Sequence, residues 1–327
     1  MKKEIRARLQ GFDIEQLRQE LLARGASGHG LISAALAFEK IDLGGASALA
    51  PFASEHIVAM LREKQKAIYG TDDRKDLYDV NLGPVLQNSE SVCSLFRASR
   101  VKDNGDGTST LVLGRFGTSN NLCPDEPFVN QPVGAFCSGF LVAPDLIATA
   151  GHCVNQDNVT TIRFVFGYRM TDPGAAPTKI PNSNIYAGAA VVGRVLTKNA
   201  ADWCVVRLSR PVAGRAPLQM RRAGRIADGQ SIYVIGHPCG LPAKFADGAN
   251  VRTNTQPSFF TANLDTYGGN SGSPVFNADT HQVEAVLVRG APDFVPKGVC
   301  MVSAVCSTNG CDGEDCTRVT EFAAIVP

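Results

Sequence analysis

Residues 268–276 read GGNSGSPVF and place Ser271 in a glycine-dense turn that leads into a predicted strand. Hydrolysis of an amide needs a nucleophile, a base that takes its proton, and donors for the oxyanion that develops. Glycines let the backbone turn sharply, so that the N–H groups of Gly269 and Ser271 can face one point. The stretch therefore predicts a nucleophilic serine flanked by backbone donors, although a glycine-rich turn alone is more often a plain hairpin.

A second stretch, residues 137–154, reads CSGFLVAPDLIATAGHCV and carries His152 directly after a predicted strand. A lone histidine is usually structural, but the segment TAGHC gives this one a distinctive context. An imidazole beside a serine hydroxyl can accept its proton and pass it to the leaving amine. We therefore predict that His152 is the general base for Ser271.

A third stretch, residues 201–212, reads ADWCVVRLSRPV and opens an apolar strand with Asp202. An acid in such a place is costly unless it is hydrogen-bonded or paired, and His152 supplies the partner. Most other acids between His152 and Ser271 lie in polar turns, where solvation explains them: Asp157, Asp172, Asp228, Asp247 and Asp265. We predict that Asp202 orients the imidazole.

Composition limits the classes of partner. The chain has 327 residues, of which 44% are hydrophobic, and 32 Lys and Arg against 31 Asp and Glu give a net charge of +1. This near balance gives no electrostatic reason to expect nucleic acid as a partner, and no run approaches the roughly 18 apolar residues of a membrane span. We expect an all-β enzyme domain of roughly 200–250 residues with a small extra module, without a nucleic-acid or membrane partner, cofactor or metal.

The first 67 residues differ from the rest. Apolar residues of 13–25 fall on one helical face after a capping-box start at Asp13. Further helical candidates cover residues 31–40 and a segment that begins near Ser54. We predict a small helical module over residues 1–67, either a pro-segment that blocks the site or an adaptor for an activating protein partner.

From Ile68 to the C-terminus, short β-branched and aromatic runs alternate with turn signals, as is typical of antiparallel β proteins. Residues 100–116 hold Asn-Gly and Asp-Gly between two such runs and are a hairpin candidate. Further strand candidates cover residues 136–143, 161–170, 190–196, 203–209, 231–236, 272–277 and 282–290. We therefore predict a mainly β domain over residues 68–327.

Residues 68–327 resemble the trypsin-like serine proteases, and more closely the bacterial glutamyl endopeptidase branch. The order His152, Asp202, Ser271 and the segments TAGHC and GNSGSPVF match the family, while IYGTDDR and IGHPCGLP match the branch. The resemblance implies a chymotrypsin-like fold of two six-stranded antiparallel β-barrels with the active site between them. It also implies a serine endopeptidase that acts on protein or peptide substrates through an acyl-enzyme intermediate.

The family's site residues carry over position by position. His152 matches the general base, Asp202 the acid that orients it and Ser271 the nucleophile. The N–H groups of Gly269 and Ser271 match the oxyanion hole. The resemblance therefore assigns to these residues the roles that their chemistry suggests.

Two further positions gain meaning from the resemblance. Cys137 and Cys153 match a disulfide around the catalytic histidine, which would close a loop of about 16 residues and contribute about 3 kcal/mol. The residue before the nucleophile is Asn270, whereas trypsin-like zymogens place there an Asp that pairs with the newly cut N-terminus. We expect that activation switch to be absent.

The signals for specificity are mixed. The resemblance implies a primary pocket lined by residues before Ser271 and by a later strand, with these candidates: Asp265, Thr266, Leu287, Val288 and Arg289. Asp265 matches the acid that binds Arg or Lys in trypsin-like enzymes, whereas Thr266 matches a threonine of the glutamyl branch, whose pocket histidine is missing here. Arg289 would bind an acidic side chain or neutralise Asp265. We favour a basic residue before the scissile bond, with Asp265 as a simple turn acid as the alternative.

Cysteine usage and the N-terminus point to different compartments. Ten cysteines suit an oxidising compartment, whereas the N-terminus lacks the apolar stretch of a signal peptide. We expect a cytoplasmic protein, with secretion as the alternative. The last four cysteines lack the paired spacing of a zinc site, so we expect disulfides or free thiols: Cys300, Cys306, Cys311 and Cys316.

Two other functions stay open. The first is an esterase or other acyl hydrolase with the same triad, which a comparison of peptide and ester substrates separates from a peptidase. The second is a catalytically silent binding module, against which the presence of all three triad residues argues.

Overall fold

A computed structural model describes most of the chain from residue 68 onward. The described residues are 5, 8, 9, 20, 49–53, 56, 68–197, 200–289, 293–308, 310, 311 and 313–327. The helical candidates at 13–25, 31–40 and from Ser54 lie almost wholly outside the described residues. Within the described residues, no helix is long and apolar enough to cross a membrane.

The N-terminal barrel closes through six antiparallel strands in the order β10–β12–β13–β9–β8–β3. Their bounds are β3 (Val92–Arg97), β8 (Cys137–Ala143), β9 (Leu146–Thr149), β10 (Ile162–Phe166), β12 (Ile185–Leu196) and β13 (Asp202–Leu208). Every residue of β8 and β9 is buried, because one face of each strand fills the barrel while the other is covered from outside. Strands buried on both faces have nearly continuous apolar sequences, and this pattern is what predicts them from the sequence.

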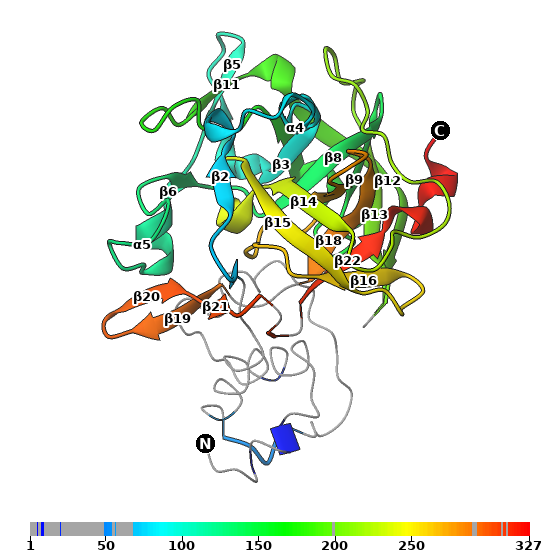
Figure 1. Cartoon of the computed structure of the whole chain (residues 1–327). Helices are drawn as coiled ribbons and strands as arrows, with labels where there is room; N and C mark the ends of the chain where they lie inside the picture. The colour runs from blue at the N-terminus through cyan, green and yellow to red at the C-terminus, as the bar shows by residue number, and fades with distance from the viewer. Residues whose placement is uncertain are drawn as a thin grey trace.

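The C-terminal barrel closes in the order β14–β17–β18–β22–β16–β15, since β14 also pairs with β15. Its strands are β14 (Ser231–Gly236), β15 (Lys244–Thr253), β16 (Phe259–Ala262), β17 (Pro274–Asn277), β18 (Val283–Arg289) and β22 (Glu314–Arg318). A short strand from far upstream, β2 (Arg74–Asp76), pairs with the start of β15 (Figure 1). The beginning of the domain is thereby tied to its second half.

The remaining helices and strands lie outside the two barrel sheets. They are β1 (Ile68–Tyr69), β4 (Val101–Asp103), β5 (Thr108–Leu111), β6 (Gly114–Arg115), β7 (Pro132–Val133), β11 (Lys179–Pro181), β19 (Phe294–Lys297), β20 (Cys300–Ser303), β21 (Val305–Cys306), α4 (Gly83–Ser89) and α5 (Phe116–Asn120). β4, β5 and β11 form one small sheet, and β19 pairs with β20. β1 pairs in parallel with β21 and so fixes Ile68 beside Val305.

One apolar core spans both barrels. It joins Phe140 and Phe164 of the N-terminal barrel to Phe245 and Phe276 of the C-terminal barrel, all almost fully buried. The chain ends in 3₁₀ turns, and Phe322 between them packs on Trp203 of β13 with ring centroids 5.5 Å apart. In Figure 1 this C-terminal segment, in red, lies beside β12 and β13. The two barrels therefore form one packed body.

The prediction of a mainly β protein with two six-stranded antiparallel barrels is confirmed, as is each strand expected from an apolar run. The hairpin at 100–116 is formed by β4 and β5. The sequence reading missed β15 because its residues KFADGANVRT contain no apolar run; a register shift and Gly248 at φ +75° bend this strand. It also missed α4, a helix of 7 residues that buries little beyond Val85.

Candidate active site

His152 and Asp202 come from neighbouring strands of the N-terminal barrel. β9 pairs with β13 so that Thr149 lies opposite Cys204, which brings the turn after β9 over the start of β13. There Asp202 Oδ2 lies 2.7 Å from His152 Nδ1, and Asp202 Oδ1 accepts the backbone N–H of His152 at 3.1 Å. Both carboxylate oxygens therefore fix the position of one histidine.

The same contact sets the tautomer of the imidazole. An ionised carboxylate can only accept, so Nδ1 of His152 carries the hydrogen and Nε2 carries the basic lone pair of the ring. The side chains of His152 and Asp202 are only 5% and 2% exposed. The free-energy cost of burying the carboxylate is offset by its hydrogen bonds to His152, the partner expected from the sequence.

Gly151 makes this turn sterically feasible. A Cβ on Gly151 would lie 2.4 Å from the carbonyl oxygen of Val195 and 2.9 Å from that of Trp203. Arg194 Nε donates to the carbonyl of Gly151 at 2.6 Å. The segment TAGHC is therefore a tightly packed turn that holds His152 by its backbone on both sides.

The turn of Ser271 is tied to the N-terminal barrel through β8. The backbone N–H of Ser138 donates to the carbonyl of Ser271 at 2.8 Å. Gly272 has φ +90°, and a Cβ there would lie 2.0 Å from the carbonyl oxygen of Ser138, so only glycine allows this approach. Cys137, the neighbour of Ser138, forms a disulfide with Cys153. This disulfide therefore links β8, whose Ser138 is bonded to Ser271, to the residue that follows His152.

Backbone amides alternate around the nucleophile candidate. The N–H of Gly268 donates to Asp293, that of Asn270 to the carbonyl of Tyr267, and that of Gly272 to the carbonyl of Leu287. The N–H groups of the two residues in between have no protein acceptor in the part of the chain that the structure describes: Gly269 and Ser271. These are the two donors that the sequence reading assigned to an oxyanion hole.

Asp265 is engaged by the start of the domain. Its Oδ1 accepts the N–H of Tyr69 at 2.7 Å and its Oδ2 accepts the N–H of Asp73 at 2.9 Å. Asp265 is 2% exposed, and burial raises the pKa of its carboxyl to about 6. These contacts favour the alternative in which Asp265 is a turn acid, because neither oxygen is turned towards an open pocket.

The other specificity candidates are buried or lie beyond description. Thr266 Oγ1 donates to Glu314 Oε2 at 2.8 Å, and both side chains are about 2% exposed. Leu287 and Val288 are buried in β18, and the side chain of Arg289 is outside the described part. The sequence analysis did not identify Glu314, because no local pattern in the terminal cysteine-rich segment indicates that this acid is buried.

Three disulfides are formed. Besides the implied pair Cys137–Cys153, they join Cys123 to Cys300 and Cys306 to Cys311. Of the terminal cluster, only Cys316 keeps its thiol, as do Cys93, Cys204 and Cys239. Three disulfides favour an oxidising compartment, so the expectation of a cytoplasmic protein receives no support and the secreted alternative is favoured.

One set of potential metal ligands lies at the site. Among the described residues, only Cys137, His152 and Cys153 form a group of at least three His, Cys, Asp or Glu residues whose ligand atoms lie within 4.8 Å of one another. Two of these three atoms are the sulfurs of a disulfide. A disulfide sulfur is not a thiolate ligand, so this group does not have the donor set of a metal centre.

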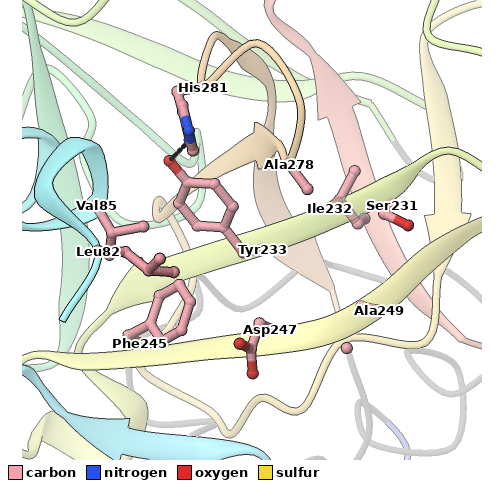
Figure 2. A pocket seen from close by; sticks show the side chains of 11 residues that line it. Leu82, Val85, Ser231, Ile232, Tyr233, Phe245, Asp247, Ala249, Ala278 and His281 are labelled. Atoms are coloured by element: carbon pink, nitrogen blue, oxygen red, sulfur yellow. Dashed lines mark hydrogen bonds between the residues drawn. The ribbon is translucent and has the colours of Figure 1, made fainter. Parts of the chain in front are cut away.

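A pocket of about 230 Å³ lies elsewhere, on the C-terminal barrel (Figure 2). α4, β14 and β15 line it, and Tyr233 on its wall bonds through its hydroxyl to Nδ1 of His281 at 3.1 Å. None of the three triad candidates lines this pocket. It is therefore separate from the site built around Ser271.

Known proteins match the part of the chain that carries these residues. The family described as trypsin-like peptidase domain matches residues 137–286. Glutamyl endopeptidase from Bacillus licheniformis is 24% identical over 155 residues, which cover 45% of this chain and 47% of the relative. A protein named extracellular metalloprotease, from Bacillus subtilis, is 29% identical over 173 residues, which cover 48% of this chain and 52% of the relative.

A solved structure, the VesB protease of Vibrio cholerae, superposes with a TM-score of 0.47 at 13% identity, over 78% of this chain and 66% of that one. The chain spans about half the length of the two curated relatives.

Proposed function

We propose that this chain is a serine endopeptidase with Ser271 as nucleophile, His152 as general base and Asp202 as the acid that orients the base, because its residues 137–286 match the family described as trypsin-like peptidase domain. The observation that carries the proposal is the pair of bonds from Asp202 to His152, at 2.7 and 3.1 Å. These bonds support a catalytic histidine because they leave Nε2 as the only basic atom of the ring.

The reaction follows from this arrangement. Ser271 Oγ attacks the carbonyl carbon of the scissile peptide bond while its proton passes to His152 Nε2. The negative charge that develops on the carbonyl oxygen is received by the N–H groups of Gly269 and Ser271, which have no other acceptor among the described residues. His152 then gives its proton to the leaving amine, which departs and leaves an acyl-enzyme.

Hydrolysis of the acyl-enzyme repeats these steps with water as the nucleophile. His152 Nε2 takes a proton from the water, which attacks the ester carbonyl, and the proton returns to Ser271 Oγ as the bond breaks. Asp202 remains ionised throughout and stabilises the imidazolium that forms twice in each cycle. The substrate is a protein or a peptide, and secretion suits the three disulfides.

The N-terminal module is proposed as the regulator of this activity, as a pro-segment or as an adaptor for an activating protein. Leu9 is fully buried, and the guanidinium of Arg8 lies 5.1 Å from the ring centroid of Phe52. These two observations on described residues support the proposed module. Binding of a partner by the full chain, and a change of its activity on cleavage near Ile68, are the expected properties.

A fluorophosphonate that reacts with activated serines tests the proposal on the full chain. We expect covalent labelling that Ser271→Ala abolishes, together with cleavage of a protein substrate. Labelling with hydrolysis of esters but not of peptides would favour an acyl hydrolase instead. No labelling of the folded chain, before or after limited proteolysis near Ile68, would contradict the proposed nucleophile and favour a binding module.

A further inference from the structure

The loop that precedes the two proposed oxyanion donors is held by residues from outside it. The N–H of Gly268 donates to both carboxylate oxygens of Asp293, at 2.9 and 3.0 Å, and the carbonyl of Gly268 accepts the N–H of Cys239. Asp265 is bonded to two backbone N–H groups of residues 69–73. The peptide groups at 269 and 271 therefore take their direction from a scaffold built by other segments.

Arg74 of β2 contacts this loop through both the ring and the hydroxyl of Tyr267. Its guanidinium lies 3.7 Å from the ring centroid of Tyr267, and its Nη2 donates to the Tyr267 hydroxyl at 2.8 Å. A cation over a desolvated aromatic face is strongly attracted to it, and the Arg74 side chain is only 1% exposed. The backbone carbonyl of the same Tyr267 accepts the N–H of Asn270 at 3.0 Å. Arg74 thus fixes the residue that orients the peptide between the two donors.

Arg74 is placed at a cost to folding. Asp72 balances its charge through bonds to Nε and Nη2, at 2.8 and 2.6 Å. Its Nη1 is buried and has no hydrogen-bond partner among the described residues. A buried donor without a partner is expensive and calls for an explanation other than stability.

The residue before the nucleophile does not offer an alternative lock. Asn270 is buried, but a neutral amide cannot form an ion pair, and its Oδ1 faces the hydroxyl of Ser273 at 3.5 Å. A cationic partner for the loop is therefore supplied from β2 rather than by a charge beside Ser271.

We propose that Arg74 is a positioning residue which, through the face and hydroxyl of Tyr267, holds the N–H groups of Gly269 and Ser271 in the direction that receives the oxyanion. This inference rests on the proposed serine peptidase activity. It gives a role in acylation to β2, a strand of 3 residues that lies nearly 200 positions upstream of the nucleophile. Arg74 of this strand would act without touching the substrate or His152.

The test compares four variants of the full chain. Arg74→Met removes the charge, Arg74→Lys keeps the charge without the planar face, and Tyr267→Phe keeps the ring without the hydroxyl. Arg210→Lys is the matched control, because the Arg210 guanidinium stacks on Tyr186 at 3.9 Å in the N-terminal barrel. For each we would measure the rate of labelling by the fluorophosphonate, kcat and KM on a peptide ester, the melting temperature, and the low-field NMR resonance of the His152 Nδ1 proton.

We expect Arg74→Met to lower the labelling rate and kcat about 100-fold, the range seen when one oxyanion donor is removed, with KM little changed. Arg74→Lys should recover part of this loss, and Tyr267→Phe should lower the labelling rate about tenfold, because it removes one hydrogen bond to the guanidinium. Arg210→Lys should keep the wild-type rate. The His152 resonance should persist in every folded variant, since the defect lies in the oxyanion donors and not in the His152–Asp202 pair.

Labelling at the wild-type rate by a folded Arg74→Met or by Tyr267→Phe would overturn the inference. If Arg74→Met does not fold, Tyr267→Phe decides the question. Loss of the His152 resonance together with labelling would also overturn it, because the effect would then pass through the general base. Absence of labelling in the wild-type chain, both before and after limited proteolysis near Ile68, would instead overturn the proposed peptidase activity, and this inference with it.

Discussion

In the N-terminal barrel, His152 follows β9 and Asp202 begins β13, and the pairing of these two neighbouring strands brings them together. In the C-terminal barrel, the loop of Ser271 is bonded to other segments through buried polar side chains, among them Arg74, Asp265 and Asp293. The first arrangement is built into two adjacent strands and a disulfide of sequence separation 16. The second needs the whole domain to be folded. The difference teaches that the proposed general base is oriented by the pairing of two neighbouring strands, whereas the proposed oxyanion donors depend on side chains from several segments of the folded chain.

The largest effect should come from the N-terminal half of the site. Asp202→Asn removes the carboxylate that fixes the tautomer of His152, so we expect kcat to fall about 10⁴-fold. The fold should persist, because Asn has nearly the same volume. Steady-state kinetics and a thermal melt check both statements. A loss of less than about tenfold would show that the register of β9 and β13 alone orients His152 and would break the comparison.

The next effect concerns stability of the C-terminal barrel. Lys244 and Asp76 form an ion pair in which both side chains are 2% exposed, and Gln131 Oε1 accepts a further bond from Lys244 Nζ at 2.7 Å. Lys244→Met leaves Asp76 buried without its cation, so we expect a loss of about 3–5 kcal/mol in the free energy of unfolding. Urea denaturation measures it.

The exposed pair of Lys75 and Asp247 is the control for that loss. Its side chains are 47% and 41% exposed and its atoms are 3.4 Å apart. Lys75→Met should cost less than about 1 kcal/mol. Equal losses for the two variants would mean that buried charges do not hold this barrel, contrary to the comparison.

The disulfides test the comparison through their effect on the entropy of the unfolded chain. Replacing Cys137 and Cys153 by alanine should lower the free energy of unfolding by about 3 kcal/mol, because the bond closes a loop of sequence separation 16. Removal of Cys306–Cys311, with a separation of 5, should cost about 2 kcal/mol. Denaturation of both double variants checks the order. A larger loss for the second pair would place the greater constraint in the C-terminal barrel.

The smallest effect is a pH dependence carried by His237. Burial lowers the pKa of His237 to about 4, while its ring stacks on Tyr168 and its Nδ1 lies 3.0 Å from the carbonyl of Leu241. Between pH 6.5 and 4 the unfolded chain takes up a proton that the folded chain refuses, so stability falls as the pH falls. From pH 7 to pH 5 the loss from this group should be about 2 kcal/mol.

His237→Gln isolates that contribution. The variant should be less stable than the wild type at pH 7, yet its stability should fall less between pH 7 and pH 5, because glutamine does not titrate. Denaturation curves at several pH values measure both slopes. Parallel slopes would show that other groups cause the acid sensitivity.

The features that the sequence predicted and those that it missed follow the same division between local patterns and distant contacts. Apolar runs predicted β8, β13, β14 and β18, because most residues of these strands are buried on both faces and few polar residues interrupt them. The pairing of Asp202 with His152 was predicted because a buried acid at the start of a strand needs a partner. β15 was missed because its bend removes the apolar pattern. The contacts of Glu314 were missed because burial of a single acid leaves no local signature.

The sequence by itself determined most of the strands and the identity of the three triad candidates, since each depends on residues close in the chain or on a motif with one chemical use. The two barrels and the disulfide beside His152 were predicted only through the resemblance to a known family. Only the tertiary structure decided that Asp265 accepts the N–H groups of Tyr69 and Asp73, that Arg74 lies on Tyr267, and that the amides of Gly269 and Ser271 have no protein acceptor among the described residues. These contacts join residues nearly 200 positions apart. No periodicity or spacing encodes such contacts, because their geometry exists only once both barrels have closed and the first strand has docked on the second barrel.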